Sequence, residues 1–250
     1  MENLIKKIEK EKINCYFLSP HLDDAVLSAG GLMSRLTKRT NVTVINIFTK
    51  AGRKSTLSAQ KSTQRAGFSS ANSYYKERVV EDSIVMKRMG VNVVNLGFSE
   101  ALWRKKYSQN FLEKFLSTFL TEFSVMYPIY RLNIIGKKIA KQDVKTVDLI
   151  KNKLSFIEKN AYVFAPLAVG GHVDHTLTFK SSEDFHNVIY WSDFPYNMID
   201  IERAAKGKRY VFKTDWDAKE KLVKLYKTQF DLLFPSGKMP KKNEVFFTNL

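Results

Sequence analysis

Two short segments of the sequence combine histidine with aspartate in a way that suits metal chemistry. They are PHLDD at residues 20–24 and GGHVDH at residues 170–175. A catalytic zinc ion is typically held by three protein ligands, among which histidine and carboxylate are common, and it keeps one position for water. A further carboxylate beside the metal can act as a general base on that water. Together the segments predict a metal-dependent site that contains His21, Asp23, Asp24, His172, Asp174 and His175.

Each segment follows a stretch that is predicted to be a buried strand. Residues 14–20 and 161–169 are apolar on both faces, which is typical of strands that are covered by helices on each side. In open α/β sheets, ligands bind beyond the carboxyl ends of parallel strands. If these two strands are parallel, both segments lie at the same edge. Taken alone, PHLDD is also typical of a helix start capped by aspartate.

The remaining chain alternates predicted strands and helices. Further strands are predicted at 41–50, 91–98 and 187–195, and helices at 26–38, 73–90, 109–123, 146–160 and 215–233. This alternation indicates an α/β, Rossmann-like fold with a mainly parallel sheet flanked by helices and an active site at the strand carboxyl ends. We expect one domain over residues 1–250, with a helical insertion around 105–160.

Residues 51–73 are polar and lack helical or strand periodicity, so we predict a long loop there. It carries the cations Arg53, Lys54, Lys61 and Arg65. A lid that faces an anionic substrate and a solvated surface loop both explain these cations. The hypothesis that they face the active site rests most on Arg53 and Lys54, which follow the strand at 41–50 directly.

Composition limits the class of protein. The 250 residues are 44% hydrophobic and carry 41 basic against 25 acidic side chains, a net charge of +16. That charge favours anionic partners, and a solvated lysine-rich surface explains it equally well. The single cysteine excludes an intrachain disulfide, and no apolar run is long enough to span a membrane. We therefore expect a cytoplasmic protein, and the sequence does not indicate its oligomeric state.

The two metal segments resemble motifs of the PIG-L (LmbE-like) family of zinc-dependent de-N-acetylases. That family carries P-H-P-D-D-E after its first strand and H-x-D-H later, which appear here as PHLDDA at 20–25 and HVDH at 172–175. Softer similarities are ERVVED at 77–82, LGFSEALWR at 96–104, YWSDFPY at 190–196 and LYKTQF at 225–230. The resemblance therefore spans most of the chain.

The resemblance implies a role for each residue of the metal segments. His21, Asp24 and His175 would hold the metal, which is expected to be Zn²⁺, with Fe²⁺ as the alternative because the same ligands suit it. Asp23 would be the general base on the metal-bound water, and His172 would stabilise the oxyanion. The implied reaction removes an N-acetyl or similar N-acyl group from an amino-sugar conjugate such as an N-acetylglucosamine derivative.

Three further residues have implied roles near the substrate. Asp174 would orient His172, and Arg78 and Glu100 would contact the sugar. Two residues depart from the family motif, because Leu22 replaces a proline and Ala25 replaces the closing glutamate. Neither position is a ligand or the base, so the implied activity stands, but a substrate inference that depends on the glutamate does not.

The competing hypothesis is a non-catalytic basic protein that binds nucleic acid or another anionic surface. Its support is the net charge and a cluster formed by Lys137, Lys138, Lys141, Lys145, Lys151 and Lys153. A solvated helix face explains that cluster equally well, and no nucleic-acid-binding module is recognisable. The expected partner is therefore a small N-acetylated sugar conjugate, with an anionic one favoured by the positive loops. His186 has no partner motif and is expected at a helix–strand junction.

Overall fold

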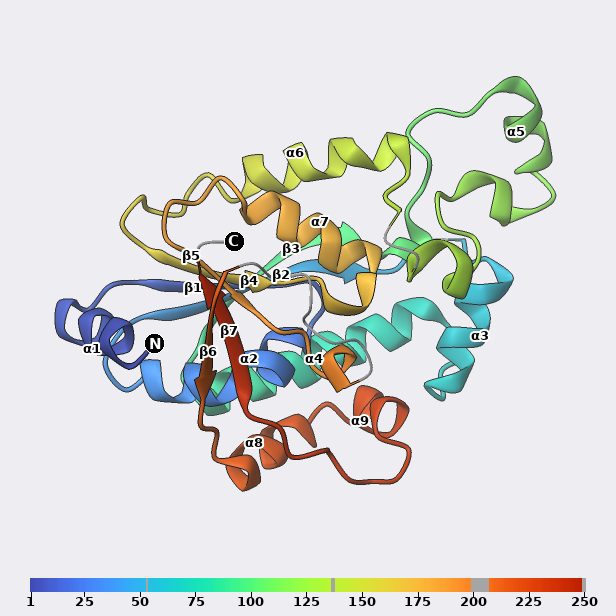
Figure 1. The fold of residues 1–250 in the computed structure, drawn as a ribbon. Coiled ribbons are helices and arrows are strands. Elements are labelled where there is room, and N and C mark those ends of the chain that lie inside the picture. The colour runs from blue at the N-terminus through green and yellow to red at the C-terminus, as the bar shows by residue number, and fades with distance from the viewer. Residues whose placement is uncertain (53, 136–137, 199–206, 249–250) are drawn as a thin grey trace.

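The five strands predicted from the sequence form the parallel part of one sheet. A computed structural model describes residues 1–52, 54–135, 138–198 and 207–248 (Figure 1). The parallel strands are β1 (Cys15–Ser19), β2 (Val42–Lys50), β3 (Asn92–Ser99), β4 (Tyr162–Pro166) and β5 (Val188–Trp191). The predicted α/β fold with a mainly parallel sheet is confirmed.

Two antiparallel strands complete the sheet, and the sequence analysis predicted neither of them. They are β6 (Lys208–Phe212) and β7 (Glu244–Thr248), and the sheet order is β3-β2-β1-β4-β5-β7-β6. Strand β7 pairs antiparallel with β5 and with β6, which makes the sheet mixed. Strand β6 lies at the edge and exposes Lys208, Arg209 and Val211, so it lacks the apolar pattern that marked the inner strands.

Helices cover both faces of the sheet, as Figure 1 shows. One face carries α2 (Asp24–Leu36), α4 (Ala71–Met89), α8 (Trp216–Val223) and α9 (Lys227–Leu233), and the other carries α6 (Val144–Lys153) and α7 (Val173–Ser182). The remaining helices are α1 (Glu2–Glu11), α3 (Leu57–Arg65) and α5 (Phe111–Leu116). In the part of the chain that is described, no helix is both long and apolar enough to cross a membrane.

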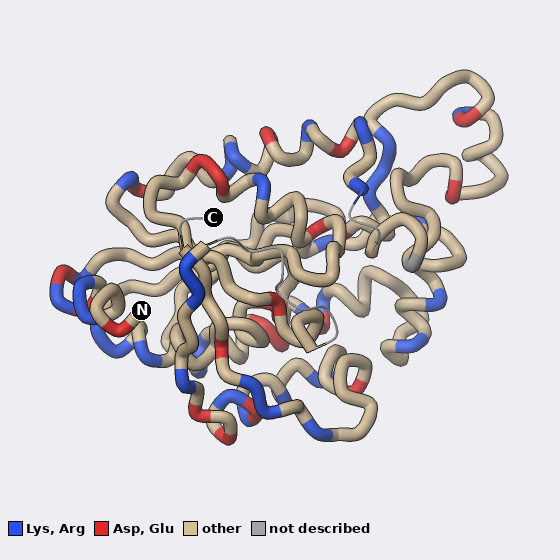
Figure 2. The backbone as a smooth tube through the Cα atoms, viewed as in Figure 1, with Lys and Arg blue, Asp and Glu red and all other residues tan. Residues whose placement is uncertain are grey.

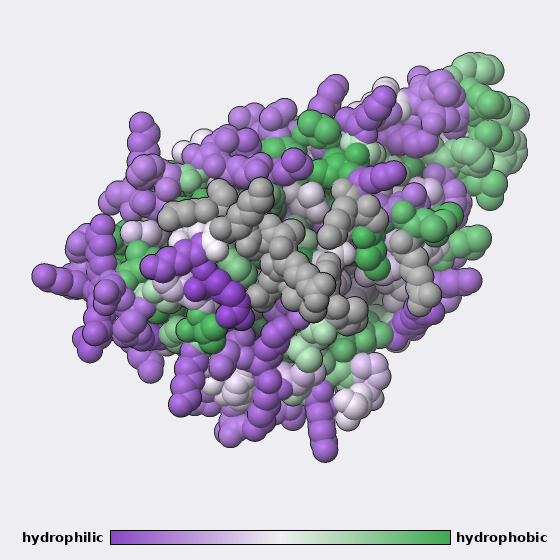
Figure 3. All heavy atoms as spheres, viewed as in Figure 1, coloured by the Kyte–Doolittle hydropathy of each residue, from purple (hydrophilic) through white to green (hydrophobic). Residues whose placement is uncertain are grey.

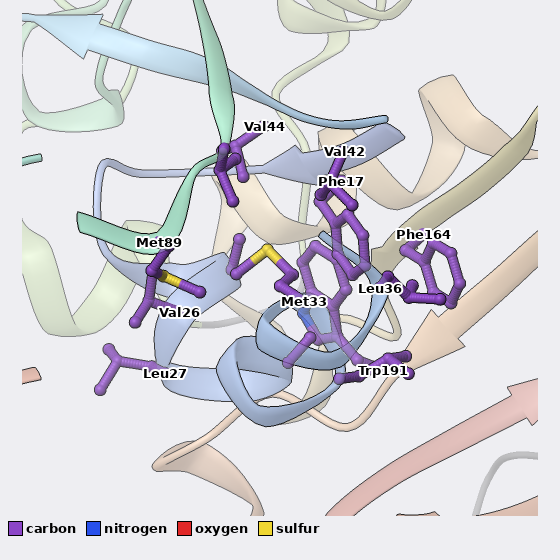
Figure 4. Packing of buried hydrophobic residues seen from close by; sticks show 14 of the residues in the cluster. Phe17, Val26, Leu27, Met33, Leu36, Val42, Val44, Met89, Phe164 and Trp191 are labelled. Atoms are coloured by element: carbon purple, nitrogen blue, oxygen red, sulfur yellow. The ribbon is translucent and has the colours of Figure 1, made fainter. Parts of the chain in front are cut away.

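Alternating strand residues build a separate core on each face. Phe17 and Phe164 lie in the core beneath α2, whereas their neighbours Leu18 and Val163 lie in the core beneath α6 and α7. The rings of Phe17 and Phe164 stack with centroids 4.3 Å apart, and Trp191 lies beside them (Figure 4). Each such buried side chain contributes about 1.5–3 kcal/mol to folding. These cores fix the strand ends from which the functional residues extend.

Several predicted boundaries were wrong, and each has a physical reason. Residues 51–73 are not one loop, because α3 forms within them and α4 begins at Ala71. Helix α3 buries only Ala59 and Thr63, so it has no apolar stripe to reveal it. The single helix predicted at 215–233 is two helices, α8 and α9. The break between them places Tyr226 so that its buried hydroxyl donates to Asp82 Oδ1 at 2.8 Å.

The predicted helices at 109–123 and 146–160 are shorter in the structure, and helix α7 was not predicted. Helix α5 covers only six residues of the predicted 109–123, and α6 ends at Lys153 rather than near residue 160. Helix α7 begins within the GGHVDH segment and has little amphipathic character, because seven of its ten residues are buried.

Candidate active site

The two histidine-containing segments meet at one edge of the sheet. Strands β1 and β4 are adjacent and parallel, with Cys15 opposite Tyr162, so their carboxyl ends lie side by side. The His21 ring lies 5.0 Å from the His172 ring and 5.4 Å from the His175 ring, measured between centroids. Three of the four histidines of the chain therefore form one buried cluster.

The turn between β4 and α7 depends on glycine. Gly170 has a φ of 80°, and a Cβ atom there would lie 2.8 Å from the Tyr196 ring. An L-residue with a side chain would be strained at this φ and would collide with the ring. The glycine thus allows the turn that delivers His172 to the start of α7.

Two histidines and one aspartate present ligand atoms to a common point. Asp24 Oδ2 lies 3.0 Å from His21 Nδ1 and 3.3 Å from His175 Nε2. The three ligand atoms lie within 4.8 Å of one another, and all three residues are buried. His175 Nε2 has no hydrogen bond to any described residue, although it is buried and close to Asp24. A buried nitrogen that makes no hydrogen bond, beside a carboxylate and a second imidazole, fits a divalent metal, and this donor set suits zinc or ferrous iron.

A second group of potential ligands consists of His21, His172 and Asp174. The carboxylate of Asp174 is already engaged, because it accepts a hydrogen bond from the Ala101 N–H at 3.1 Å and pairs with the guanidinium of Arg104. It also lies 3.1 Å from His21 Nε2. Since a metal there would displace these partners, the set that contains Asp24 and His175 Nε2, which makes no hydrogen bond to a described residue, fits a metal better.

Asp193 supports His175 and was not identified from the sequence. Its Oδ1 lies 2.6 Å from His175 Nδ1, and its Oδ2 accepts the Val169 N–H at 3.0 Å. A carboxylate on the far nitrogen of a metal-binding histidine fixes the ring orientation and makes the other nitrogen a better ligand. The sequence signal was the soft similarity of YWSDFPY at 190–196, which covers the end of β5 and the loop after it and has no defined spacing to the metal segments.

Charges within the cluster shift the pKa values of its members. Burial lowers the pKa of His175, but the carboxylates of Asp24 and Asp193 outweigh burial and raise it to about 9. Burial raises the pKa of Asp24, but the adjacent His175 and His21 hold it well below its usual range. Asp24 is therefore ionised, as a carboxylate ligand must be.

Asp23 lies beside the ligands but has different partners. It occupies the N-cap position of α2, yet its side chain makes no capping hydrogen bond to a described residue, so capping does not explain it. Arg78 Nη2 donates to Asp23 Oδ1 at 3.3 Å, and Nη1 of the same guanidinium lies 3.4 Å from Glu100 Oε2. Burial raises the pKa of Asp23, and the charge of Arg78 opposes that rise. The residues expected to bind sugar, Arg78 and Glu100, thus also form an ion-pair chain to Asp23.

His172 has a defined hydrogen-bonding state. Its Nδ1 accepts the Asp174 backbone N–H at 3.2 Å, so a neutral ring carries its proton on Nε2. Burial together with the neighbouring His21 and His175 holds the pKa of His172 well below its usual range. The family resemblance implies that Asp174 orients His172. The backbone N–H of Asp174 contacts His172, whereas the Asp174 carboxylate contacts His21 and Arg104.

A cavity of about 430 Å³ opens over this edge of the sheet. Six of the eight predicted site residues line it: His21, Asp23, Asp24, Arg78, Glu100 and His172. Its apolar and aromatic wall consists of Leu27, Tyr74, Trp103, Tyr130, Tyr196, Leu232 and Leu233. Asp174 and His175 are buried beneath these residues. The cavity therefore combines a polar floor with a largely aromatic wall, as ligand sites commonly do.

Cations from the segment 51–73 also reach the cavity, but they are not the ones expected to matter most. Lys61 and Arg65 of α3 line it. Lys54 is exposed and is not among the described lining residues, and Arg53 lies outside the described residues. His186 is exposed between α7 and β5, at the predicted helix–strand junction and away from the cluster.

Comparisons with known proteins agree with this architecture. A family model described as "PIG-L: GlcNAc-PI de-N-acetylase" matches residues 16–185. Teicoplanin deacetylase in complex with teicoplanin has a TM-score of 0.70 and 20% identity, covering 94% of this chain and 97% of that chain. A zinc-inhibited form of teicoplanin deacetylase Orf2 gives a TM-score of 0.70 and 19% identity over the same shares.

A third solved structure is the A40926 pseudoaglycone deacetylase Dbv21. Its TM-score is 0.67 at 20% identity, and the match covers 94% of this chain and 96% of that chain. At such identities the structural likeness establishes the shared fold alone. No curated protein sequence matches the chain significantly.

Proposed function

The chain belongs to the PIG-L family of de-N-acetylases, and from this premise we propose that it hydrolyses the N-acetyl group of an amino-sugar conjugate in the cavity over the β1 and β4 ends. The reaction adds water across the amide. The acyl carbon–nitrogen bond breaks, the acyl group leaves as acetate, and the amine of the sugar is released.

One observation supports this proposal: three residues that could hold a metal lie together, and the carboxylate of a fourth residue beside them is not part of that set. The ligand atoms of His21, Asp24 and His175 lie within 4.8 Å of one another, and Nε2 of His175 has no hydrogen bond to a described residue. Asp23 is next to this set, lines the cavity and is held by Arg78 instead. A hydrolase of this kind needs both parts, because one group must bind the metal while another moves the proton.

The residues of the chain divide the proposed reaction between them. A divalent metal held by His21, Asp24 and His175 would lower the pKa of a water molecule and polarise the acyl carbonyl. Asp23 takes the proton of the attacking water and then returns it to the leaving amine. Its pKa is raised by burial, which makes its carboxyl a better proton carrier than an exposed aspartate.

In this proposal His172 stabilises the developing oxyanion by donating a hydrogen bond to it. Because its Nδ1 is occupied by the Asp174 N–H, the neutral ring presents Nε2–H as a donor. The depressed pKa keeps the ring neutral, so it acts as a hydrogen-bond donor and not as the general acid. Losing one such donor costs about 100- to 1,000-fold in kcat in a comparable acyl-transfer site.

The substrate class rests on the family and on the shape of the cavity. The family is described as a GlcNAc-PI de-N-acetylase, and the similar structures are a deacetylase in complex with teicoplanin and the A40926 pseudoaglycone deacetylase. The aromatic wall suits the apolar faces of a sugar ring, and Lys61 and Arg65 suit an anionic substituent on the conjugate. We propose Zn²⁺ as the metal, with Fe²⁺ as the alternative.

A screen for acetate release tests the proposal. Metal-loaded protein is incubated with N-acetylglucosamine linked to lipid, inositol phosphate, nucleotide and peptide carriers, and acetate and free amine are measured together. We expect equal amounts of acetate and amine from at least one conjugate, and none from the Asp23→Asn variant. Absence of release from every conjugate by protein that demonstrably holds metal would overturn the proposed reaction.

A further inference from the structure

A cluster of large apolar side chains lies on the outside of the molecule. The segment 105–125, which we call the α5 protrusion, contains Phe111, Leu112, Phe115, Phe119 and Leu120, and these are 53–88% exposed. Figure 1 shows α5 extending away from the sheet and its covering helices, and Figure 3 shows that this tip is predominantly hydrophobic. Scattered exposed apolar residues are normal in proteins, but a contiguous group of this kind usually marks an interaction site.

The protrusion is not held in place by packing of these side chains. None of the six described residues of α5 is buried, and the five apolar residues lie outside both hydrophobic cores. Its shape depends instead on polar contacts, which are an Asn110–Glu113 capping box and a backbone bridge between Lys105 and Val125. Apart from an edge-to-face contact between the Phe115 and Phe119 rings, with centroids 5.5 Å apart, the apolar side chains therefore contribute little to the internal structure of the protein.

Unpaired lysines surround the base of the protrusion. Lys105, Lys141 and Lys145 lie there, and Lys114 lies on α5 itself; all four are exposed and form no ion pair with any described residue. Hydrogen bonds between Ser108 and Gln142, and between Tyr107 and Thr146, hold the segment that carries Lys141 and Lys145 against this base. Figure 2 shows basic residues where the protrusion joins the body, and Figure 3 shows hydrophilic residues next to the apolar tip.

The acidic groups of the protrusion, Glu113 and Glu122, offset only part of the positive charge, because two carboxylates stand against Lys106 and the four lysines named above. Glu113 is paired with Lys106 at 2.6 Å, and Glu122 accepts the Leu57 N–H at 2.8 Å. The local charge therefore has the same sign as the net charge of +16. An apolar tip above a basic base is the arrangement by which proteins bind the surface of an anionic membrane.

We propose that the α5 protrusion docks the protein on an anionic lipid bilayer, with the apolar side chains inserted among the lipids and the lysines at the headgroups. Charge complementarity selects this partner over a second copy of the chain. Two copies that meet through their protrusions would bring unpaired lysines together, and each copy carries +16. The proposal concerns binding to a surface and does not depend on the proposed hydrolysis.

Vesicle co-sedimentation tests this docking. The full chain is mixed with vesicles of phosphatidylcholine alone, or with vesicles that also contain phosphatidylglycerol, at low and high salt. We expect binding that is at least about ten-fold stronger to the anionic vesicles and that weakens with salt. The double variant Phe111→Ser with Phe119→Ser should reduce that binding at least about ten-fold.

A matched control separates docking from general hydrophobicity. Val80 and Ile84 are each 51% exposed on α4, so Val80→Ser with Ile84→Ser also removes exposed apolar surface, of smaller extent, elsewhere on the molecule. That variant should bind the anionic vesicles within about two-fold of wild type, and thermal unfolding should show that both double variants are folded. No binding of wild type at low salt, or equal loss in both variants, would overturn the proposal. So would a wild-type dimer in sedimentation velocity that Phe111→Ser with Phe119→Ser converts to a monomer.

Discussion

In most proteins charged side chains are exposed and apolar side chains are buried. Two regions of this molecule depart from that rule: the cluster at the β1 and β4 ends, and the α5 protrusion. The cluster buries charged groups such as Asp23 and Asp24, whereas the protrusion exposes apolar groups such as Phe111 and Phe119. Each arrangement is unfavourable on its own, because buried charge loses hydration and exposed apolar surface orders water. Both arrangements therefore point to partners outside the chain: a metal and substrate at the cluster, and a surface at the protrusion.

The two regions also differ in the structure that holds their residues in place. The cluster residues extend from β1, β4, α2 and α7, which the two hydrophobic cores hold rigidly. The protrusion rests on a six-residue helix and a backbone bridge. Substitutions in the cluster should therefore change chemistry or stability strongly, whereas substitutions at the protrusion should change only what the protein binds.

The largest effect is expected at Asp23. Asp23→Asn removes the proposed proton acceptor but no ligand, so activity should fall about 100- to 10,000-fold while most of the metal remains. Asp24→Asn is the matched comparison and should lose metal as well as activity, because Asp24 completes the ligand set. Acetate release and elemental analysis measure both. If Asp23→Asn empties the site and Asp24→Asn leaves it full, the roles of the two aspartates are reversed.

Asp82 sharpens the comparison, because it is a buried carboxyl that lies outside the metal ligands. It accepts hydrogen bonds from Asn46 and Tyr226, and burial raises its pKa from 3.8 to about 7. Between these pH values the folded protein keeps a proton that the unfolded chain has lost. The stability contributed by protonated Asp82 is therefore present below about pH 4 and is lost as the pH rises through about 7.

Asp82→Asn cannot ionise and should remove this pH dependence. Relative to wild type, the free energy of unfolding of the variant should improve between pH 4.5 and 7.5 by on the order of 2–3 kcal/mol. Urea unfolding of both proteins at the two pH values measures the change. A difference between the proteins that does not vary with pH would contradict the assignment.

Asp193 should show an intermediate effect. Asp193→Asn loses the carboxylate that orients His175 but keeps all three proposed ligands, so metal affinity should fall about 10- to 100-fold. Asp148→Asn, at an exposed position on α6, is the control and should leave the affinity unchanged. Competition with a chelator of known affinity gives both values. Equal affinities for the three proteins would show that Asp193 does not support the metal.

The inner part of the fold and of the site could be predicted from the sequence because the relevant residues lie next to strong patterns. The strands before His21 and His172 are apolar on both faces, and such strands are found inside parallel sheets. Parallel neighbours then place both segments at one edge. The same reasoning missed β6, whose exposed edge residues carry no apolar pattern, and α3, which buries only two small side chains.

Contacts made by loops escaped the sequence analysis for a different reason. Asp193 reaches His175 through a turn after β5, and Arg104 reaches Asp174 through a turn after β3. Neither pairing follows from periodicity, since each depends on how a loop folds back over the strand ends. The preference for Lys54 over Lys61 and Arg65 was wrong for a similar reason, because the unexpected helix α3 turns its own cations toward the cavity, whereas the prediction for Arg53 lies outside the described residues.

The smallest predicted effect concerns these cations at the cavity. Lys61→Ala with Arg65→Ala should raise KM several-fold at low salt for an anionic substrate and flatten its salt dependence, with kcat little changed. Exposed charges act on encounter and binding, and salt screens them over about 8–10 Å. Lys54→Ala, an exposed cation of the same segment outside the cavity lining, is the control. If wild type, the double variant and Lys54→Ala have the same KM at low salt, these cations do not contribute to substrate binding and are solvated surface residues.

The metal content of the purified protein tests the central claim most directly. Wild-type protein prepared without chelator should contain about one divalent ion per chain, as a site with three protein ligands requires. His175→Ala should lose that ion, whereas His186→Ala, which changes an exposed histidine away from the cluster, should keep it. Wild-type protein that holds no metal and takes up neither zinc nor ferrous iron would contradict the account. Equal loss in the two histidine variants would contradict it as well.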